Sequence, residues 1–178
     1  MAIVPESELE RRIVADPRWQ EGAAWGTPRP GHPEGSVAGH IEEVLSNVDD
    51  EASDAVDRER LRFVALIHDT FKHRVQRARP RTGDNHHAVV ARQFAEHYTN
   101  DVELLELIEL HDESYNAWLK GRRSGDWPAA EARARRLLDR LGRSAPLYLR
   151  FYRADARTGD KSREPLVWFE GLARERSR

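Results

Sequence analysis

The sequence has 178 residues, a length typical of one domain with one hydrophobic core. Its 29 Lys and Arg residues balance 31 Asp and Glu residues, and the net charge of -2 gives no overall basic field for a nucleic-acid polymer. Cysteine is absent, which excludes disulfides, thiolate catalysis and cysteine-bound metal clusters, so any metal must bind through His, Asp and Glu.

Apolar residues recur at helical spacing through most of the chain, and no stretch alternates as a strand does, so the sequence predicts an all-α protein. We expect N-caps at Ser36, at Asp54 or Asp57, at Asn85, at Asn100 or Asp101, and at Asp126. In chain order the expected helices cover residues 5–14, 36–48, 54–72, 86–98, 101–111 with a continuation to 120, 126–141, 144–156 and 165–174.

Two segments read as loops. Residues 16–35 are rich in Gly, Pro and Trp, and we expect them to pack over one mouth of a helical bundle. Residues 74–84 contain four arginines together with Pro80 and Gly83. The chain has no internal repeat and no flexible linker, so one domain over residues 1–178 is expected. The N-terminus has no apolar signal core and no apolar run reaches the ~20 residues that cross a bilayer, so we expect a cytoplasmic protein without a membrane partner.

Several predicted helices place a metal-ligand type of side chain on the apolar stripe that faces the core. His40 lies one turn from Val37 and Val44, and His68 continues the stripe of the next helix, with Asp69 beside it. In the helix after the arginine-rich loop His87, and not His86, is in register with the stripe. The full set of inward residues is His40, His68, Asp69, His87, His111 and Asp155.

A single inward histidine is usually a satisfied core residue, but six such residues on five helices would each be costly to bury without a shared partner. A common metal centre provides that partner. Neutral imidazoles and carboxylates bind Fe, Mn, Ni, Co or Zn, and a carboxylate can bridge two ions through its two oxygens. The sequence therefore predicts one or two divalent transition metal ions.

The order His40, His68-Asp69, His87, His111, Asp155 resembles the HD-domain superfamily of metal-dependent phosphohydrolases over about residues 35–160. Lys72 completes the HDxxK form of the motif, and the stretches GSVAGHIEEVL, FVALIHDTFKH and FYRADARTGD are similar to family segments. The resemblance implies a compact helical bundle of the HD-domain type, with the N-terminal helix and loop and the C-terminal helix packed on it. The Gly-Tyr-Pro signature of cyclic dinucleotide phosphodiesterases is absent.

The resemblance also implies roles. Asp69 would bridge two ions, with His40, His68 and Asp155 completing one coordination sphere and His87 and His111 the other; with a single ion, His87 and His111 would be outer-sphere or substrate contacts. Asp69 and Lys72 are the expected catalytic residues. The expected substrate-binding residues are Lys72, His86, Asp112, Arg81 and Lys161.

Some of these candidates have a simpler interpretation. Lys72 is also compatible with a solvated helix end, His86 with a helix cap, and Arg81 with a solvated loop. Asp112 would orient a ligand histidine or act as a base, although a carboxylate at a helix end needs neither role. His32, His73 and His97 lack register with any stripe and are expected at the surface.

The leading interpretation is a phosphohydrolase that acts on a small phosphorylated metabolite, with a nucleotide as the best candidate. One alternative is a di-iron oxygenase, because family members that cleave C–C or C–P bonds with oxygen use the same six ligands. Another is a non-catalytic ligand-binding HD domain. The sequence does not indicate the oligomeric state.

Overall fold

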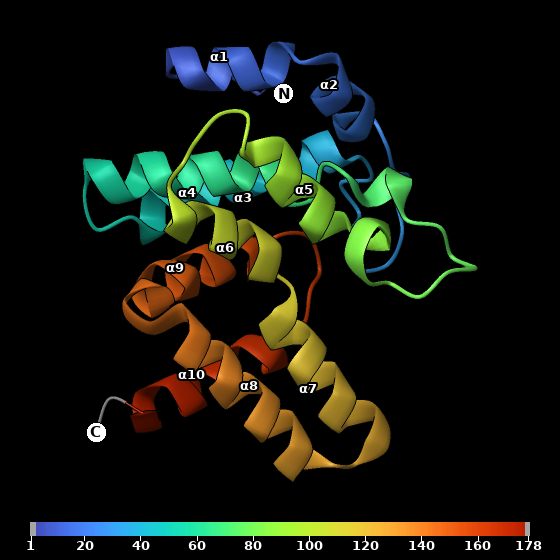
Figure 1. Cartoon of the computed structure of the whole chain (residues 1–178), viewed down its shortest axis with the longest axis vertical. Coiled ribbons are helices and arrows are strands. Elements are labelled where there is room, and N and C mark those ends of the chain that lie inside the picture. The colour runs from blue at the N-terminus through green and yellow to red at the C-terminus, as the bar shows by residue number, and fades with distance from the viewer. Residues whose placement is uncertain (1–2, 177–178) are drawn as a thin grey trace.

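The computed structural model describes residues 3–176, and within this range it contains helices, turns and loops but no strand, which confirms the all-α prediction (Figure 1). The helices are α1 (Glu8–Ala15), α2 (Pro17–Ala23), α3 (Val37–Glu51), α4 (Ala55–Ile67), α5 (His87–Ala95), α6 (Val102–Leu110), α7 (Glu113–Ser124), α8 (Trp127–Leu141), α9 (Ala145–Ala156) and α10 (Glu164–Arg176). Short 3-10 turns, η1 to η3, cover Lys72–Arg74, Gly83–Asn85 and Gly142–Ser144. None of the helices in the described range has both the length and the apolar composition of a bilayer span.

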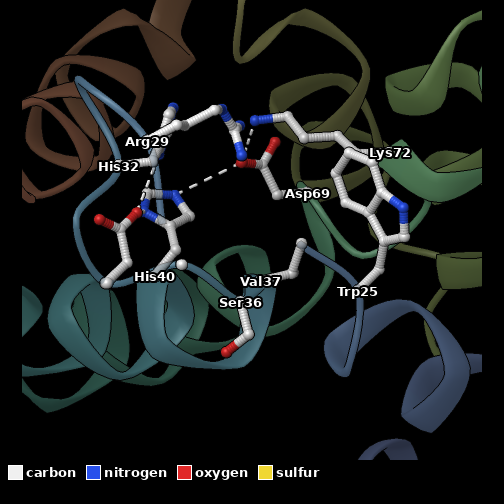
Figure 2. Close-up of a pocket in the computed structure, with 10 residues that line it drawn as sticks. Trp25, Arg29, His32, Ser36, Val37, His40, Asp69 and Lys72 are labelled. Atoms are coloured by element: carbon white, nitrogen blue, oxygen red, sulfur yellow. Dashed lines mark hydrogen bonds and ion pairs between the residues drawn. The ribbon is translucent and has the colours of Figure 1, made fainter. Parts of the chain in front are cut away.

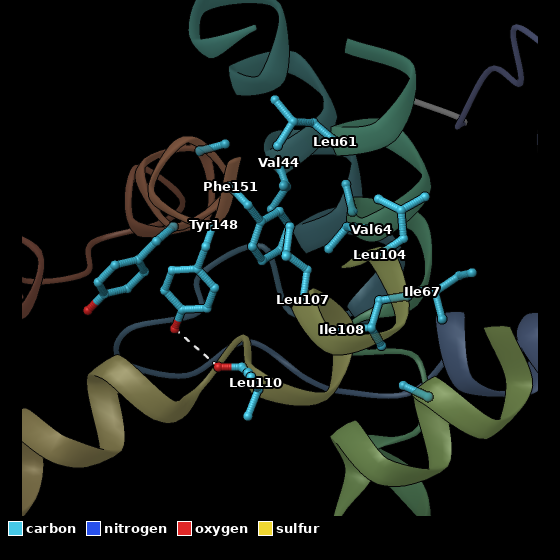
Figure 3. Packing of buried hydrophobic residues seen from close by; sticks show 14 of the residues in the cluster. Val44, Leu61, Val64, Ile67, Leu104, Leu107, Ile108, Leu110, Tyr148 and Phe151 are labelled. Atoms are coloured by element: carbon cyan, nitrogen blue, oxygen red, sulfur yellow. Dashed lines mark hydrogen bonds between the residues drawn. The ribbon is translucent and has the colours of Figure 1, made fainter. Parts of the chain in front are cut away.

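The core is centred on α4, whose residues from Leu61 to Ile67 are all buried. Side chains from α3, α6 and α9 pack around it, among them Val44, Leu107 and Phe151 (Figure 3). Buried apolar residues continue into the outer helices, from Ile13 in α1 to Leu172 in α10. The inner helices therefore have little freedom to shift, and side chains at their ends are held in place by the packing.

The predicted N-caps are largely confirmed. Ser36 accepts a hydrogen bond from the backbone N–H of Gly39, and Asp54, Asp101 and Asp126 cap α4, α6 and α8 in the same way. Of the paired candidates, the structure therefore selects Asp54 over Asp57 and Asp101 over Asn100. The start of α1 differs, because Ser7 provides the cap and the helix begins at Glu8 instead of residue 5.

The expectation of a loop over all of residues 16–35 is wrong at its start, where Pro17–Ala23 forms α2. Asp16 caps this helix and Pro17 stands in its first turn, both standard start signals, but seven residues are too few to show a periodic stripe. The indole N–H of Trp19 donates to the carbonyl oxygen of Leu66 at 2.7 Å. Gly22 approaches so closely that a Cβ there would lie 1.8 Å from the Thr70 carbonyl oxygen. α2 thus packs directly on the chain around His68 and Asp69.

Several further boundaries differ from the prediction, and three of them have a clear local cause. α4 ends at Ile67 instead of residue 72, because the chain turns at once and enters η1. α5 begins at His87 with His86 as its cap, while Asn85 instead closes the preceding loop through the carbonyl oxygens of residues 76, 79 and 80. α7 continues through Gly121, whose lack of a side chain makes room for the ring of Trp127.

A buried ion pair attaches α1 to α4 and gives a stability prediction. Glu10 and Arg62 are 4 % and 5 % exposed, and two hydrogen bonds of 2.8 Å join the guanidinium to the carboxylate. Glu10→Ala removes the carboxylate that binds the buried Arg62 guanidinium. We expect this change to lower the free energy of unfolding by about 3 kcal/mol. Glu8→Ala, which removes the exposed Glu8–Arg11 pair, should cost less than about 1 kcal/mol. Urea unfolding measures both, and equal losses would contradict this assignment.

Candidate metal centre

Five helices converge on one buried group of histidine and aspartate side chains. His40 comes from the first turn of α3, His68 and Asp69 from the end of α4, His87 from the start of α5, His111 from the end of α6 and Asp155 from α9. The first five are at most 8 % exposed, and the side chain of Asp155 is 19 % exposed. The inward orientation that helical register predicted is therefore confirmed for the four histidines.

One half of the group surrounds the Nε2 atom of His40. This atom lies 3.2 Å from Nε2 of His68, 3.0 Å from Oδ1 of Asp155 and 3.4 Å from Oδ2 of Asp69. His68 Nε2 is 3.6 Å from the same Asp69 oxygen. Two imidazole nitrogens and two carboxylate oxygens thus point at one another, which is the donor set that suits a first-row divalent ion.

The other half lies on the opposite side of Asp69. Nε2 of His87 and Nε2 of His111 are 3.3 Å apart, and they lie 3.5 Å and 3.2 Å from Oδ1 of Asp69. The two oxygens of one carboxylate therefore face two separate pairs of histidines. This is the arrangement that a bridging carboxylate between two ions requires.

Backbone carbonyls fix the ring orientation of two of the histidines. Nδ1 of His68 lies 2.9 Å from the carbonyl oxygen of Ala65, and Nδ1 of His111 lies 2.8 Å from that of Ile108. A carbonyl oxygen only accepts, so in both rings Nδ1 carries the proton and, in the neutral ring, Nε2 presents its lone pair to the centre. Lone pairs converging on a buried space fit a cation, so the residues present fit the ions that the sequence predicts.

The surroundings of these side chains set their protonation states. Burial lowers the pKa of His68 to about 3, which keeps this ring neutral at physiological pH. Burial would raise the pKa of Asp69, but the Lys72 ammonium beside it holds that pKa well below its usual value, so the carboxylate is ionised. Burial would likewise lower the pKa of His111, but the carboxylates of Asp112 and Asp69 raise it to about 9. Binding of a cation at His111 therefore displaces a proton.

Lys72 reaches the centre by a different route from the one expected. It lies in η1 and not on a continuation of α4, yet its ammonium forms an ion pair with Oδ2 of Asp69. Lys161 follows α9 and binds the Asp155 carboxylate and carbonyl oxygen at 3.0 and 3.1 Å. Both predicted cations therefore border the group.

Asp112 lies closer to the histidines than a substrate-binding residue at the rim would. Its Oδ2 is 3.2 Å from Nε2 of His87 and its Oδ1 is 3.5 Å from Nε2 of His111, with 32 % of the side chain exposed. Burial would raise its pKa, but His111 and His87 lower it below the usual value for an aspartate. Asp112 is thus an ionised carboxylate beside the second pair of histidines.

Two of the predicted substrate contacts lie farther out. His86 accepts the backbone N–H of Ala88 at Nδ1 as the cap of α5, and its ring stacks on that of His87 with centroids 5.2 Å apart. Arg81 is exposed on the loop between η1 and η2, which projects from the helices in Figure 1. In the described part of the chain Arg81 makes no hydrogen bond or ion pair, so the structure does not bring it to the group.

The loop before α3 contributes residues that the sequence did not single out. A pocket over the group is lined by Trp25, Arg29, His32 and Glu34 together with His40, Asp69 and Lys72, and Figure 2 shows the side chain of Arg29 extended toward Asp69. The expectation that His32 is a surface residue is wrong, because its ring packs edge-on against that of His40 with centroids 5.8 Å apart. His73 is also partly buried, and His97 is exposed as expected.

The fold and the group together are those of a helical domain whose buried His and Asp side chains fit a metal ion. The family model for the HD domain matches residues 36–144, and the chain belongs to the HD-domain family. Domains of this family bind divalent metal ions and form a superfamily of metal-dependent phosphohydrolases. No curated protein and no solved structure matches the chain. Asp155 lies beyond the matched residues, and the packing of α9 against α3 brings it to the group.

Two adjacent histidines provide a test of which side chains hold an ion. His87→Ala removes one of the two Nε2 atoms beside Oδ1 of Asp69 and is expected to cost the protein one bound ion. His86→Ala removes only a helix cap and a rim imidazole, so metal content should be retained. Elemental analysis of the two purified variants measures the difference. Loss of metal in His86→Ala with full occupancy in His87→Ala would refute the assignment.

Proposed function

We propose that this protein is a metal-dependent phosphohydrolase that cleaves a phosphoester of a small phosphorylated metabolite, with a nucleotide as the leading candidate. The observation that carries the proposal is the Asp69 carboxylate, whose two oxygens face two pairs of histidine Nε2 atoms while a lysine ammonium contacts one of them. Membership of the HD-domain family supports it.

In this proposal His40, His68 and Asp155 would hold one divalent ion, His87 and His111 would hold a second, and Asp69 would be shared between them. The distances of Asp112 to His87 and His111 make it a further candidate ligand of the second ion. When bound, the ions supply a water of lowered pKa as the nucleophile and Lewis-acid stabilisation of the phosphoryl oxygens.

The protein's own residues bind and orient the substrate. Lys72 lies at the mouth with 25 % of its side chain exposed, and the carboxylates of Asp69 and Asp112 raise its pKa despite burial, so it is an ammonium that can contact a phosphoryl oxygen. Arg29 lines the same pocket, and its guanidinium has no ion-pair or hydrogen-bond partner within residues 3–176. The unpaired Arg29 guanidinium beside the Lys72 ammonium favours an anionic substrate such as a phosphate ester.

A nucleotide is favoured because an aromatic side chain stands beside these cations. Trp25 lines the pocket and is 40 % exposed, an unusual state for so large an apolar ring. An exposed indole next to a phosphate site provides a surface on which a base can stack, at a gain of about 1–3 kcal/mol.

The test is a hydrolysis screen over nucleoside monophosphates, sugar phosphates and a neutral control, with the protein loaded in turn with Mn, Fe, Co, Ni and Zn. We expect metal-dependent release of phosphate, with nucleotides the best substrates. Oxygen consumption by the iron-loaded protein without hydrolysis would favour the di-iron oxygenase instead. Nucleotide binding without turnover under any metal would indicate a non-catalytic binding domain.

A further inference from the structure

The loop that leads into α3 places a buried carboxylate next to the proposed centre. Val37 donates its backbone N–H to the carbonyl oxygen of Trp25 at 2.8 Å, which joins the two ends of the loop, and Gly31 in its middle donates to Asp160 at 2.6 Å. Within it, the side chain of Glu34 is only 4 % exposed. A carboxylate at this depth needs a partner, because burial without one costs several kcal/mol.

Two buried polar atoms of this loop and of α3 lack hydrogen-bond partners. They are Oε2 of Glu34 and Nδ1 of His40. The nearer oxygen of Glu34, Oε1, lies 3.6 Å from Nδ1 of His40, just beyond hydrogen-bond range. The same oxygen accepts a hydrogen bond from Nδ1 of His32 at 2.8 Å. Since buried polar atoms are nearly always paired, a small shift of the Glu34 carboxylate toward His40 gives Nδ1 of His40 the acceptor that it lacks.

The position of His40 in its helix explains why a side chain is needed here. His68 and His111 stand at the C-terminal ends of α4 and α6, where backbone carbonyls lack intrahelical partners and can accept from Nδ1. His40 stands in the first turn of α3, where the free backbone groups are N–H donors. The helix therefore cannot supply an acceptor for His40, and Glu34 is the carboxylate that lies beside its Nδ1.

We infer that Glu34 is a positioning residue for the metal centre, whose carboxylate accepts the Nδ1 proton of His40. This hydrogen bond fixes the tautomer with the lone pair on Nε2, aims that atom at Asp155 and His68, and raises the basicity of the ring. The inference rests on the proposed metal centre, but it requires no turnover and is tested without a substrate.

The first experiment records the tautomer of His40 in the metal-free protein by long-range ¹H–¹⁵N correlation NMR, at a pH at which the ring is neutral. In the unmodified protein we expect the proton on Nδ1. In Glu34→Ala we expect a mixture of tautomers, and in Glu34→Gln, which keeps an accepting oxygen, the original tautomer in large part. A proton on Nε2 in the unmodified protein, or an identical spectrum in Glu34→Ala, would overturn the inference.

The second experiment measures stepwise Mn²⁺ affinity by competition with a chelating dye. Loss of the partner that orients a ligand histidine typically weakens binding about 10–100-fold. Glu34→Ala is expected to show this loss in one binding step and not in the other, and Glu34→Gln should recover part of it. If Glu34→Ala binds both ions as the unmodified protein does, Glu34 does not position His40.

Asp160→Ala is the matched control, because it releases Gly31 and loosens the same loop while leaving the Glu34 carboxylate in place. We expect both of its binding steps to stay within about twofold of the unmodified protein. An equal loss in Asp160→Ala would mean that the position of the loop, and not the carboxylate, controls the affinity.

These results separate the inference from the proposed function. If Glu34 controls the tautomer and one binding step but no phosphate ester is hydrolysed, the phosphohydrolase proposal fails and the positioning role stands. If hydrolysis occurs and Glu34→Ala changes neither the tautomer nor the Mn²⁺ affinity, the positioning role fails and the phosphohydrolase proposal stands. His32, Glu34 and His40 also lie close enough together to share an ion. A third Mn²⁺ that is lost in Glu34→Ala, with no proton on Nδ1 of His40, would replace the positioning role by a further metal site.

Discussion

Asp69→Ala is expected to abolish both metal retention and hydrolysis while leaving the helical fold intact. Among the ion pairs of residues 3–176, Asp69 is the one carboxylate that contacts both pairs of histidines, through Oδ2 on one side and Oδ1 on the other. Without it neither proposed ion keeps its shared ligand. Since each 1.36 kcal/mol of lost transition-state stabilisation is tenfold in rate, loss of a metal centre worth several kcal/mol should lower turnover on the order of a thousandfold or more.

The fold should survive because Asp69 stands in the turn after α4 and is not part of the apolar core. Circular dichroism and elemental analysis of the purified variant check the two halves of the prediction. Asp69→Asn is the stricter test. It keeps the shape of the side chain but replaces one carboxylate oxygen by an amide nitrogen, so the side chain cannot bridge two ions. Asp84→Ala, in the exposed turn η2, is the control carboxylate. Turnover of Asp69→Ala at the rate of the unmodified protein would contradict the proposed mechanism.

Lys72→Ala is expected to lower hydrolysis on the order of a hundredfold while leaving the metal content unchanged. Its ammonium stands at the mouth beside Asp69, and removing one charge-assisted contact to a transferring phosphoryl group typically costs this much. Because Lys72 is not a proposed ligand, the loss should be in rate and not in occupancy. Steady-state kinetics and elemental analysis on the same sample make the distinction.

Lys72→Arg should recover part of the rate, because it restores the charge with a different geometry. Arg123→Ala removes an exposed cation on α7, outside the pocket, and serves as the control. If Lys72→Ala hydrolyses its best phosphate ester at the unmodified rate, Lys72 is a solvated cation that takes no part in the reaction. If iron-loaded protein consumes oxygen while neither form hydrolyses any ester, the oxygenase interpretation takes the place of the proposal.

The sequence was informative wherever periodicity could be read. His40, His68, His87 and His111 each continue an apolar stripe, and all four point inward in the structure. Helical register also separated His87 from its neighbour His86, which caps α5 instead. Helical register determines which face of a helix a residue occupies. Register alone is therefore sufficient to predict that these histidines are buried.

The part of the site that comes from a loop could not be predicted in this way. Arg29, His32 and Glu34 lie in a stretch without periodicity, and only tertiary contacts such as Gly31 to Asp160 bring them to the pocket. α2 escaped detection for a similar reason, because it is too short to show a stripe. The turn that ends α4 at Ile67 was missed because the apolar pattern runs on through Phe71, which is buried without being helical.

A crystal structure of the Mn²⁺-loaded protein, recorded with anomalous scattering, shows directly whether Asp69 is shared between two ions. We expect two anomalous peaks roughly 3.5–4 Å apart, one beside His40, His68 and Asp155 and the other beside His87 and His111, with one Asp69 oxygen on each. A single peak away from Asp69, or no peak among these residues at full Mn²⁺ loading, would contradict it.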